Sequence, residues 1–196
     1  MSHTLLLSVI FAALTFSLLL TGESQDFTKS IPSESLGLGE EKLSHLHFYL
    51  HDIVSGRNAT AIRVATSAIS NTSATRFSDV LVIDDLLTVG PDPSSKQLGR
   101  AQGIYTSASL SEVSLLMAFN YVFTVGKYNG STLSILGRNP IFSDVREMPV
   151  VGGSGVFRFA RGYAQARTHF IDWNSGDAVV EYNMSRLYPN QIEKWH

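Results

Sequence analysis

Turn-forming residues recur at short intervals between residues 55 and 176, and this spacing constrains the fold more than any other feature of the chain. Between the turns lie extended stretches rich in Val, Ile, Thr, Tyr and Phe, which favour β-strands. These stretches are residues 47–53, 60–69, 79–88, 100–107, 115–125, 131–136, 145–151, 156–168 and 177–185. Short strands at this spacing indicate an antiparallel sandwich or barrel. We therefore expect an all-β chain, and eight or nine strands suit a closed antiparallel barrel, which also leaves no exposed edge.

The composition indicates one globular domain held by its core. Hydrophobic residues make up 44% of the 196 residues and charged residues 16%, which argues against disorder. The chain has no cysteine, so disulfides, thiol catalysis and zinc–thiolate sites are excluded. The net charge of −2 comes from intermixed acidic and basic residues, with no basic stripe. Nucleic acid is therefore not an expected partner.

The N-terminus carries a targeting signal. Residues 5–20 form an uncharged, mainly apolar run, and the first charged side chain is Glu23. A membrane anchor is the alternative, but the run is short for a spanning helix, which needs about 20 residues. We therefore expect a signal peptide, secretion to the extracellular space, and no membrane segment after cleavage. The predicted order is signal peptide 1–24, flexible leader 25–43, barrel domain 44–188 and polar tail 189–196.

Glycosylation is expected because the chain carries four sequons of the N-x-S/T form. They begin at Asn58, Asn71, Asn129 and Asn183. Asn129-Gly130 also predicts a hairpin turn, which would expose Asn129. Asn183 falls in a predicted strand, which makes it the weakest of the four candidates.

Asp52 is the first candidate for chemistry. Alternation along the first strand places Asp52 on the same side as Phe48 and Leu50. If that side is the interior, burial raises the pKa of the Asp52 carboxyl and lets it act as a general acid. The alternative is that Asp52 ends the strand and bonds a loop. The phenol of Tyr105 either bonds a phenolic ligand or completes a packed face, and a lone arginine such as Arg146 is more often an ion pair.

Other patterns carry less information. Residues 152–155 are Gly-Gly-Ser-Gly, but they lack the spacing of a nucleotide-binding loop and precede a strand, so we interpret them as a hairpin turn. His47 and His51 share a strand face, but no third ligand is placed near them, so no metal is expected. The motif Gly-x-Ser-x-Gly does not occur, and a hydrolase elbow is not supported.

Eight segments together form a recognisable order. They are FYLHDI at 48–53, the sequon at 58–60, DDLLT at 84–88, GRAQGIY at 99–105, NYVF at 120–123, GSTL at 130–133, VREMPVVGGSG at 145–155 and FARGY at 159–163. In this order and spacing they resemble the dirigent family, over about residues 44 to 183. No single segment is specific, but the ordered set is.

The resemblance implies an eight-stranded barrel that assembles as a homo-oligomer, a trimer or a dimer, in the apoplast. It implies no cofactor and no oxidising activity. A separate oxidase, a laccase or a peroxidase, makes phenoxy radicals from a phenol such as coniferyl alcohol. The dirigent protein then holds two radicals so that they couple with one handedness into optically active lignans, which a water-excluding cavity suits. A related branch, of the pterocarpan synthase type, dehydrates an isoflavanol through a quinone methide.

The family's functional residues match this chain at Asp52, Tyr105 and Arg146, which the resemblance makes candidate catalytic residues. Two positions depart from the lignan-forming pattern: Asn139 replaces a second aspartate, and Ser107 replaces a second tyrosine. Together with Phe123, these two are the candidate substrate-binding residues. Asparagine cannot donate a carboxyl proton, so the departures shift weight from lignan formation toward another dirigent branch with another phenolic substrate, of which the isoflavanol dehydratase is one hypothesis. A non-catalytic wall protein or carbohydrate-binding protein is the third hypothesis.

Overall fold

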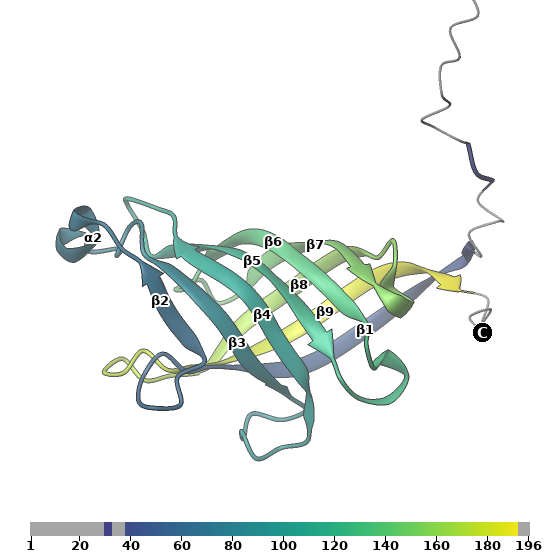
Figure 1. Cartoon of the computed structure of the whole chain (residues 1–196), viewed down its shortest axis with the longest axis horizontal. Coiled ribbons are helices and arrows are strands. Elements are labelled where there is room, and N and C mark those ends of the chain that lie inside the picture. Colours follow the sequence, from purple (N-terminus) through teal and green to yellow (C-terminus); the bar gives the residue numbers. More distant parts are fainter. Residues whose placement is uncertain (1–29, 33–37, 192–196) are drawn as a thin grey trace, which may run out of the picture. The chain divides into compact units, whose positions relative to one another are not determined.

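The structure is a computed structural model that describes residues 30–32 and 38–191. The chain divides into two compact units, Met1–Leu36 and Gly37–His196. The predicted signal peptide lies outside the described residues. The second unit contains β1 (Leu38–Asp52), β2 (Ala61–Ala65), α2 (Ala68–Thr72), β3 (Val80–Thr88), β4 (Gln97–Ser107), β5 (Ser114–Phe123), η2 (Gly126–Tyr128), β6 (Thr132–Pro140), β7 (Arg146–Ser154), η3 (Gly155–Phe157), β8 (Arg161–Ile171) and β9 (Ala178–Gln191) (Figure 1). No helix in these ranges has the length and apolar character needed to cross a membrane.

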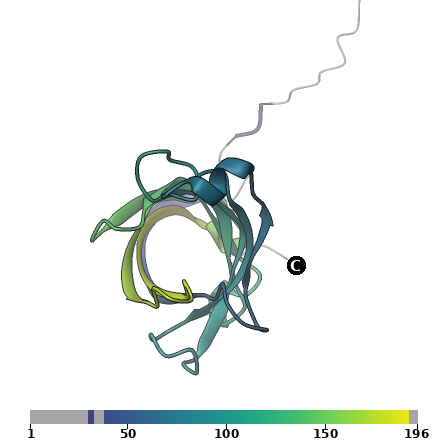
Figure 2. The same ribbon diagram turned by 90° about the vertical axis from the view of Figure 1, so that its left-hand side faces the viewer.

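Eight of the strands form a closed ring, seen end-on in Figure 2. Neighbouring strands follow the order β1-β9-β8-β7-β6-β5-β4-β3, and every pair is antiparallel. The ring closes where the C-terminal part of β3 pairs with β1, with Leu50 opposite Leu87. Strand β2 pairs with the N-terminal part of β3 as a ninth strand outside the ring. The expected eight-stranded antiparallel barrel is therefore confirmed.

The ends of the barrel domain differ from the prediction. β1 begins at Leu38 and β9 runs to Gln191, and the two strands pair along this whole length. Residues 38–43 of the predicted leader and 189–191 of the predicted tail are thus strand residues. Pro189 is tolerated because β9 pairs with β8 only as far as Leu187, so that beyond this point one edge needs no N–H donor. The N-terminal end of β1 and the C-terminal end of β9 pair with each other. A local sequence pattern cannot predict this pairing, because the partner of each segment lies at the other end of the domain.

A second difference is the start of β8. The prediction begins a strand at residue 156, but residues 155–157 form the short 3₁₀ helix η3 and β8 begins at Arg161. Gly155 has φ +61° and Phe159 has φ +62°, and this left-handed backbone interrupts the extended conformation.

Aromatic rings fill one half of the barrel. Phe48, Tyr121, Phe123 and Phe157 are at most 3% exposed, and neighbouring rings pack edge to face at centroid distances of 4.9 to 6.2 Å. At the same end the fully buried guanidinium of Arg186 lies 4.3 Å from the ring centroid of Phe157. This packed half leaves the opposite half, where β1, β4, β6 and β8 end, to form the cavity.

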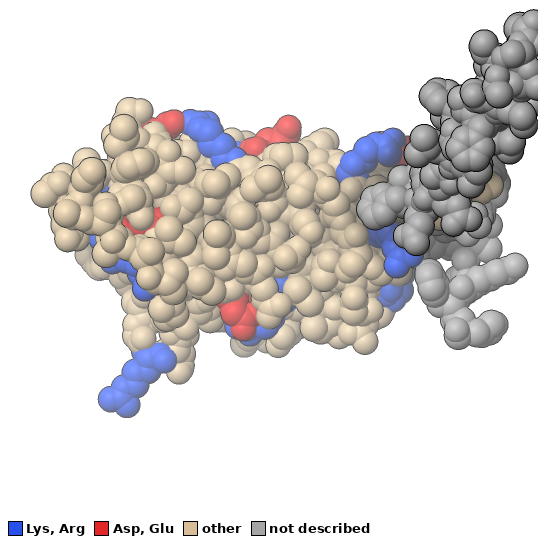
Figure 3. Space-filling view, turned by 45° about the horizontal axis from the view of Figure 1, so that its top comes forward, with Lys and Arg blue, Asp and Glu red and all other residues tan. Residues whose placement is uncertain are grey.

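The outer face of strands β2 to β6 carries a row of apolar side chains. Successive cross-strand partners are Ile62, Val82, Ile104, Ala118 and Leu136. The four larger side chains in this row are 41% to 53% exposed. Charged side chains are scattered over the face shown in Figure 3, with uncharged surface between them. Because the row continues across five strands, it forms a continuous exposed apolar patch and not a set of isolated exposed residues.

Candidate functional site

A cavity of about 700 Å³ occupies the open half of the barrel. Its wall comes from inward-facing residues of the barrel strands and from the loops that follow β6 and β8. In an antiparallel barrel the ends of alternate strands meet at one rim, which is why residues far apart in sequence converge here. The volume lies in the range of small-molecule pockets.

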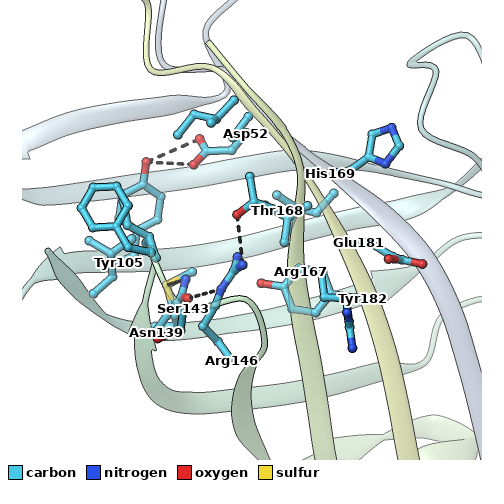
Figure 4. Close-up of a pocket in the computed structure, with 18 of the residues that line it drawn as sticks. Asp52, Tyr105, Asn139, Ser143, Arg146, Arg167, Thr168, His169, Glu181 and Tyr182 are labelled. Atoms are coloured by element: carbon cyan, nitrogen blue, oxygen red, sulfur yellow. Dashed lines mark hydrogen bonds between the residues drawn. The ribbon is translucent and has the colours of Figure 1, made fainter. Parts of the chain in front are cut away.

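Two carboxyl groups reach this cavity. Asp52, the last residue of β1, accepts hydrogen bonds from Tyr105 Oη at 3.2 Å on Oδ2 and 3.4 Å on Oδ1 (Figure 4). Asp85 in β3 is 1% exposed and accepts a hydrogen bond from Thr60 Oγ1 at 2.6 Å on Oδ1. Asp85 Oδ2 is buried and has no hydrogen-bond partner among the described residues. An unmet acceptor of this kind is stabilised when the carboxyl carries a proton.

Burial raises the pKa of both carboxyl groups. It raises the pKa of Asp52 to about 6, although the hydrogen bond from Tyr105 lowers it and the charge of Asp177 raises it further. Burial raises the pKa of Asp85 to about 8, and the charge of Asp52 adds to this. Burial and these two carboxyl groups raise the pKa of Tyr105, which stays a neutral donor. Because each carboxylate disfavours ionisation of the other, the pair keeps a proton at neutral pH.

A positive charge lies on the other side of the same cavity. Arg146 begins β7 and is 3% exposed. Its Nε donates to Asn139 Oδ1 at 3.1 Å, and its Nη1 donates to Thr168 Oγ1 at 3.0 Å (Figure 4). Within the described part of the chain, no carboxylate forms a salt bridge with Arg146. Asn139 therefore orients the guanidinium without neutralising it, which leaves the charge for an oxyanion in the cavity.

The comparisons with known proteins decide the family. A family model described as "Dirigent-like protein" matches residues 43–186. The chain belongs to the dirigent family. It is 52% identical to Dirigent protein 21 of Arabidopsis thaliana over 182 residues, which cover 93% of this chain and 96% of that protein.

Several similar proteins and solved structures carry the name pterocarpan synthase. Pterocarpan synthase 1 of Glycyrrhiza echinata is 48% identical over 179 residues, which cover 90% of this chain and 95% of that protein. The solved structure of the pterocarpan synthase dirigent protein GePTS1 matches with a TM-score of 0.76 at 48% identity, and the match covers 83% of this chain and 100% of that one. The fold of this dirigent chain thus matches that of GePTS1 over the whole of the GePTS1 chain.

Four of the residues singled out in the sequence meet in this dirigent cavity. They are Asp52, Tyr105, Asn139 and Arg146. Two others do not line it. Ser107, the last residue of β4, is buried beyond the cavity wall. Phe123 belongs to the packed half, where its ring lies against those of Phe48, Tyr128 and Phe157. Phe123 lies on the same strand side as Leu115 and Met117, which line the cavity, but alternation does not tell how far along the barrel a side chain lies.

Asp85 is the main residue that the sequence did not single out. Strand β3 is apolar on both faces, so alternation does not tell which of Asp84 and Asp85 points inward. Asp84 points outward and forms a salt bridge with Arg100 at 2.6 Å. The structure shows that Asp85 shares its strand face with Ile83 and Leu87, which are 3% and 0% exposed, and the sequence alone carries no signal that marks this face as inward.

The remaining candidates lie outside the cavity. Asn58, Asn71 and Asn129 are exposed, whereas Asn183 is half-buried and its Oδ1 lies 3.2 Å from His45 Nε2. His47 Nε2 lies 2.7 Å from Glu181 Oε1, and His51 Nε2 lies 2.7 Å from Thr88 Oγ1. In the ranges that the structure describes, no group of three or more His, Asp or Glu side chains is placed to hold a metal ion.

Proposed function

We propose that this dirigent family member is an acid-assisted dehydratase that closes a ring on a phenolic substrate through a quinone methide. The observation that carries the proposal is the placement of Asp52 and Asp85 in one cavity, with Tyr105 beside them and Arg146 opposite. The similarity to Pterocarpan synthase 1 of Glycyrrhiza echinata, at 48% identity, supports a substrate of the isoflavanol class.

The first step is loss of water. The substrate is a phenol with a hydroxyl group on a saturated carbon that is attached to the phenol ring ortho or para to the phenol oxygen. The protonated carboxyl of the Asp52–Asp85 pair donates its proton to that hydroxyl, the C–O bond breaks, and water leaves. The phenol oxygen gives its proton to solvent and its electron pair to the ring, which produces a neutral quinone methide. Arg146 stabilises the negative charge that develops on this oxygen.

The second step closes the ring. Another phenol hydroxyl of the same molecule adds to the methide carbon and forms a new C–O bond. The carboxylate left by the first step takes the proton of that hydroxyl, which regenerates the acid. The electron pair returns to the quinone oxygen, which takes a proton from solvent. The net change is the loss of one water molecule, so neither an oxidant nor a cofactor is needed.

Variants of three neighbouring aspartates test this mechanism. Asp52→Asn and Asp85→Asn each remove one carboxyl group from the pair. Asp84→Asn is the matched control, because Asp84 points away from the barrel interior and forms a salt bridge with Arg100. The substrate is a phenolic isoflavan-4-ol, and ring closure is followed by liquid chromatography. Loss of a general acid lowers turnover by about 100- to 10,000-fold. The mechanism is wrong if both inner variants turn over at the rate of the Asp84→Asn control.

Stereoselective radical coupling is the second candidate function. The identity with Dirigent protein 21 and the size of the cavity favour it, since the cavity has room to orient flat phenols. In this case a separate laccase or peroxidase supplies the radicals. The test is to oxidise coniferyl alcohol with a laccase in the presence of the protein and to measure product handedness by chiral chromatography. A racemic product at saturating protein counts against this function with that substrate.

We also propose that the protein acts in the apoplast as a glycosylated homo-oligomer. The apolar run at residues 5–20 supports secretion, and the exposure of Asn58, Asn71 and Asn129 supports glycosylation at these three sequons. The apolar row across β2 to β6 supports self-association. A glycosidase that removes N-linked glycans is expected to increase the electrophoretic mobility of protein collected from the extracellular space, and unchanged mobility would argue against glycosylation.

A further inference from the structure

Two large aromatic rings lie exposed at the rim of the cavity. Phe142 is 64% exposed and Trp173 is 68% exposed, and both line the cavity. They come from different loops, Phe142 from residues 141–145 and Trp173 from residues 172–177, yet their ring centroids are 5.7 Å apart with the planes tilted by 34°. Exposed aromatic rings that meet beside a cavity are typical of sites that stack on a ligand.

The loop of Trp173 is held in place by hydrogen bonds. Asp172 Oδ1 accepts from the backbone N–H of Asn174 at 2.9 Å, and the Asp172 carbonyl accepts from the N–H of Gly176 at 2.7 Å. Asp177 Oδ1 accepts from the N–H of Val54 at 2.9 Å, which ties the loop to the segment directly after β1. These hydrogen bonds fix the position of the Trp173 loop relative to the end of β1, where Asp52 lies.

The loop of Phe142 is also ordered by backbone contacts. Ser143 N–H donates to the carbonyl of Pro140 at 3.0 Å, and Ile141 N–H donates to the carbonyl of Val113 at 3.3 Å. Ile141 and Ser143 on either side of the ring line the cavity too. Both rings thus lie on turns that backbone hydrogen bonds hold in place. A ligand that reaches the rim meets a preformed aromatic surface.

We infer that Phe142 and Trp173 form an aromatic subsite that holds the outer ring of the substrate while its reacting phenol lies at Asp52 and Asp85. The inference rests on the proposed function and deepens it by assigning two specificity-determining residues, which contact a second aromatic ring beyond the reacting phenol. A single-ring phenol fits the inner cavity without reaching the rim. The subsite therefore selects for two-ring phenols over single-ring phenols.

Tryptophan fluorescence provides a direct measurement of this contact. The chain has two tryptophans, Trp173 and Trp195, so Trp195→Phe leaves Trp173 as the only reporter. In that background we titrate a phenolic isoflavan-4-ol as the two-ring probe, 4-hydroxybenzyl alcohol as the single-ring probe and a cello-oligosaccharide as a sugar control. We expect saturable quenching by the two-ring probe. Quenching by the sugar alone would overturn the inference.

Phe142→Ala is the decisive variant, and Phe170→Ala is its matched control because Phe170 is 56% exposed nearby but does not line the cavity. Loss of one aromatic partner is expected to weaken binding of the two-ring probe by about 2- to 10-fold. Binding of the single-ring probe stays unchanged in both variants, and KM for the isoflavan-4-ol rises while kcat is kept. If Phe142→Ala binds the two-ring probe as tightly as Phe170→Ala, the subsite does not exist.

The subsite and the proposed function fail in different ways. If Asp85→Asn abolishes turnover but Phe142→Ala binds and turns over like the control, the subsite is wrong and the proposed function stands. If the two-ring probe binds and Phe142→Ala weakens it, but no turnover occurs, the subsite stands and the dehydratase is wrong. If neither phenol binds, both are wrong.

Discussion

Replacing Asp85 with asparagine removes a carboxyl group that folding places in the barrel at 1% exposure. Burial and the charge of Asp52 raise the pKa of Asp85 to about 8, whereas an aspartate in the unfolded chain titrates near about 3.9. The folded state therefore keeps a proton that the unfolded state has lost between these two pH values. By linkage, the stability of the unmodified protein is fully present below the unfolded pKa and falls as the pH rises toward the folded pKa.

The expected size of this effect follows from one proton. Each pH unit in that window lowers the free energy of unfolding by up to about 1.4 kcal/mol relative to a variant without the carboxyl group. Between pH 5 and pH 7 the Asp85→Asn variant is therefore expected to gain on the order of 2 to 3 kcal/mol relative to the unmodified protein. The new amide also changes local hydrogen bonding, but that offset does not depend on pH. The test therefore depends on how the free energy of unfolding changes with pH, and not on its absolute value.

Urea unfolding at pH 5, 6 and 7 measures the slope for the unmodified protein, Asp85→Asn and Asp84→Asn. Asp84 is the matched control, because hydrogen bonds from Gln102 and Arg100 and the charge of Arg100 lower its pKa although its desolvation opposes this. The free energy of unfolding of Asp84→Asn is expected to show no comparable gain over the unmodified protein as the pH rises. If the free energies of the unmodified protein and Asp85→Asn run parallel from pH 5 to pH 7, Asp85 is ionised in the folded protein and cannot serve as the acid.

Three further predictions concern other parts of the barrel. Tyr105→Phe removes a hydrogen bond that lowers the pKa of Asp52, so NMR titration of labelled carboxyl carbons is expected to show a higher Asp52 pKa, and an unchanged value would contradict the contact. Arg186→Lys replaces a planar cation that lies over three rings, and thermal unfolding is expected to show a loss of about 1 to 2 kcal/mol; equal stability would mean that the stacking contributes nothing. Leu136→Lys places a charge in the apolar outer row and is expected to reduce the molar mass found by light scattering, which an unchanged oligomer would refute.

The barrel could be predicted because it depends on local signals. Turn residues at short intervals and β-favouring stretches define the strands, and eight or nine strands suit a closed barrel, which leaves no exposed edge. The position of Asp52 was accessible in part, because alternation places it on the same side of β1 as Phe48 and Leu50, and the structure shows that this side points inward. The pairing of Leu38 with Gln191 was not accessible, because each end of the domain depends on a partner at the other end of the sequence.

The full site could not be predicted for three physical reasons. Asp85 lies in a strand that is apolar on both faces, so no alternation marks it as inward. Phe123 is on the correct face but in the packed half, because strand alternation carries no information on position along the barrel axis. Phe142 and Trp173 lie in loops, which have no periodicity, and only the closed fold brings the two together.

The most direct test of the central claim is the mass of the product formed without any oxidase. The protein is incubated under argon with a phenolic isoflavan-4-ol, and the products are analysed by liquid chromatography and mass spectrometry. If the Asp52–Asp85 pair acts as the acid, the unmodified protein forms a product lighter by one water molecule, and Asp85→Asn forms it at least about 100-fold more slowly. A product that appears only after laccase and oxygen are added would contradict the account and leave radical coupling as the better description.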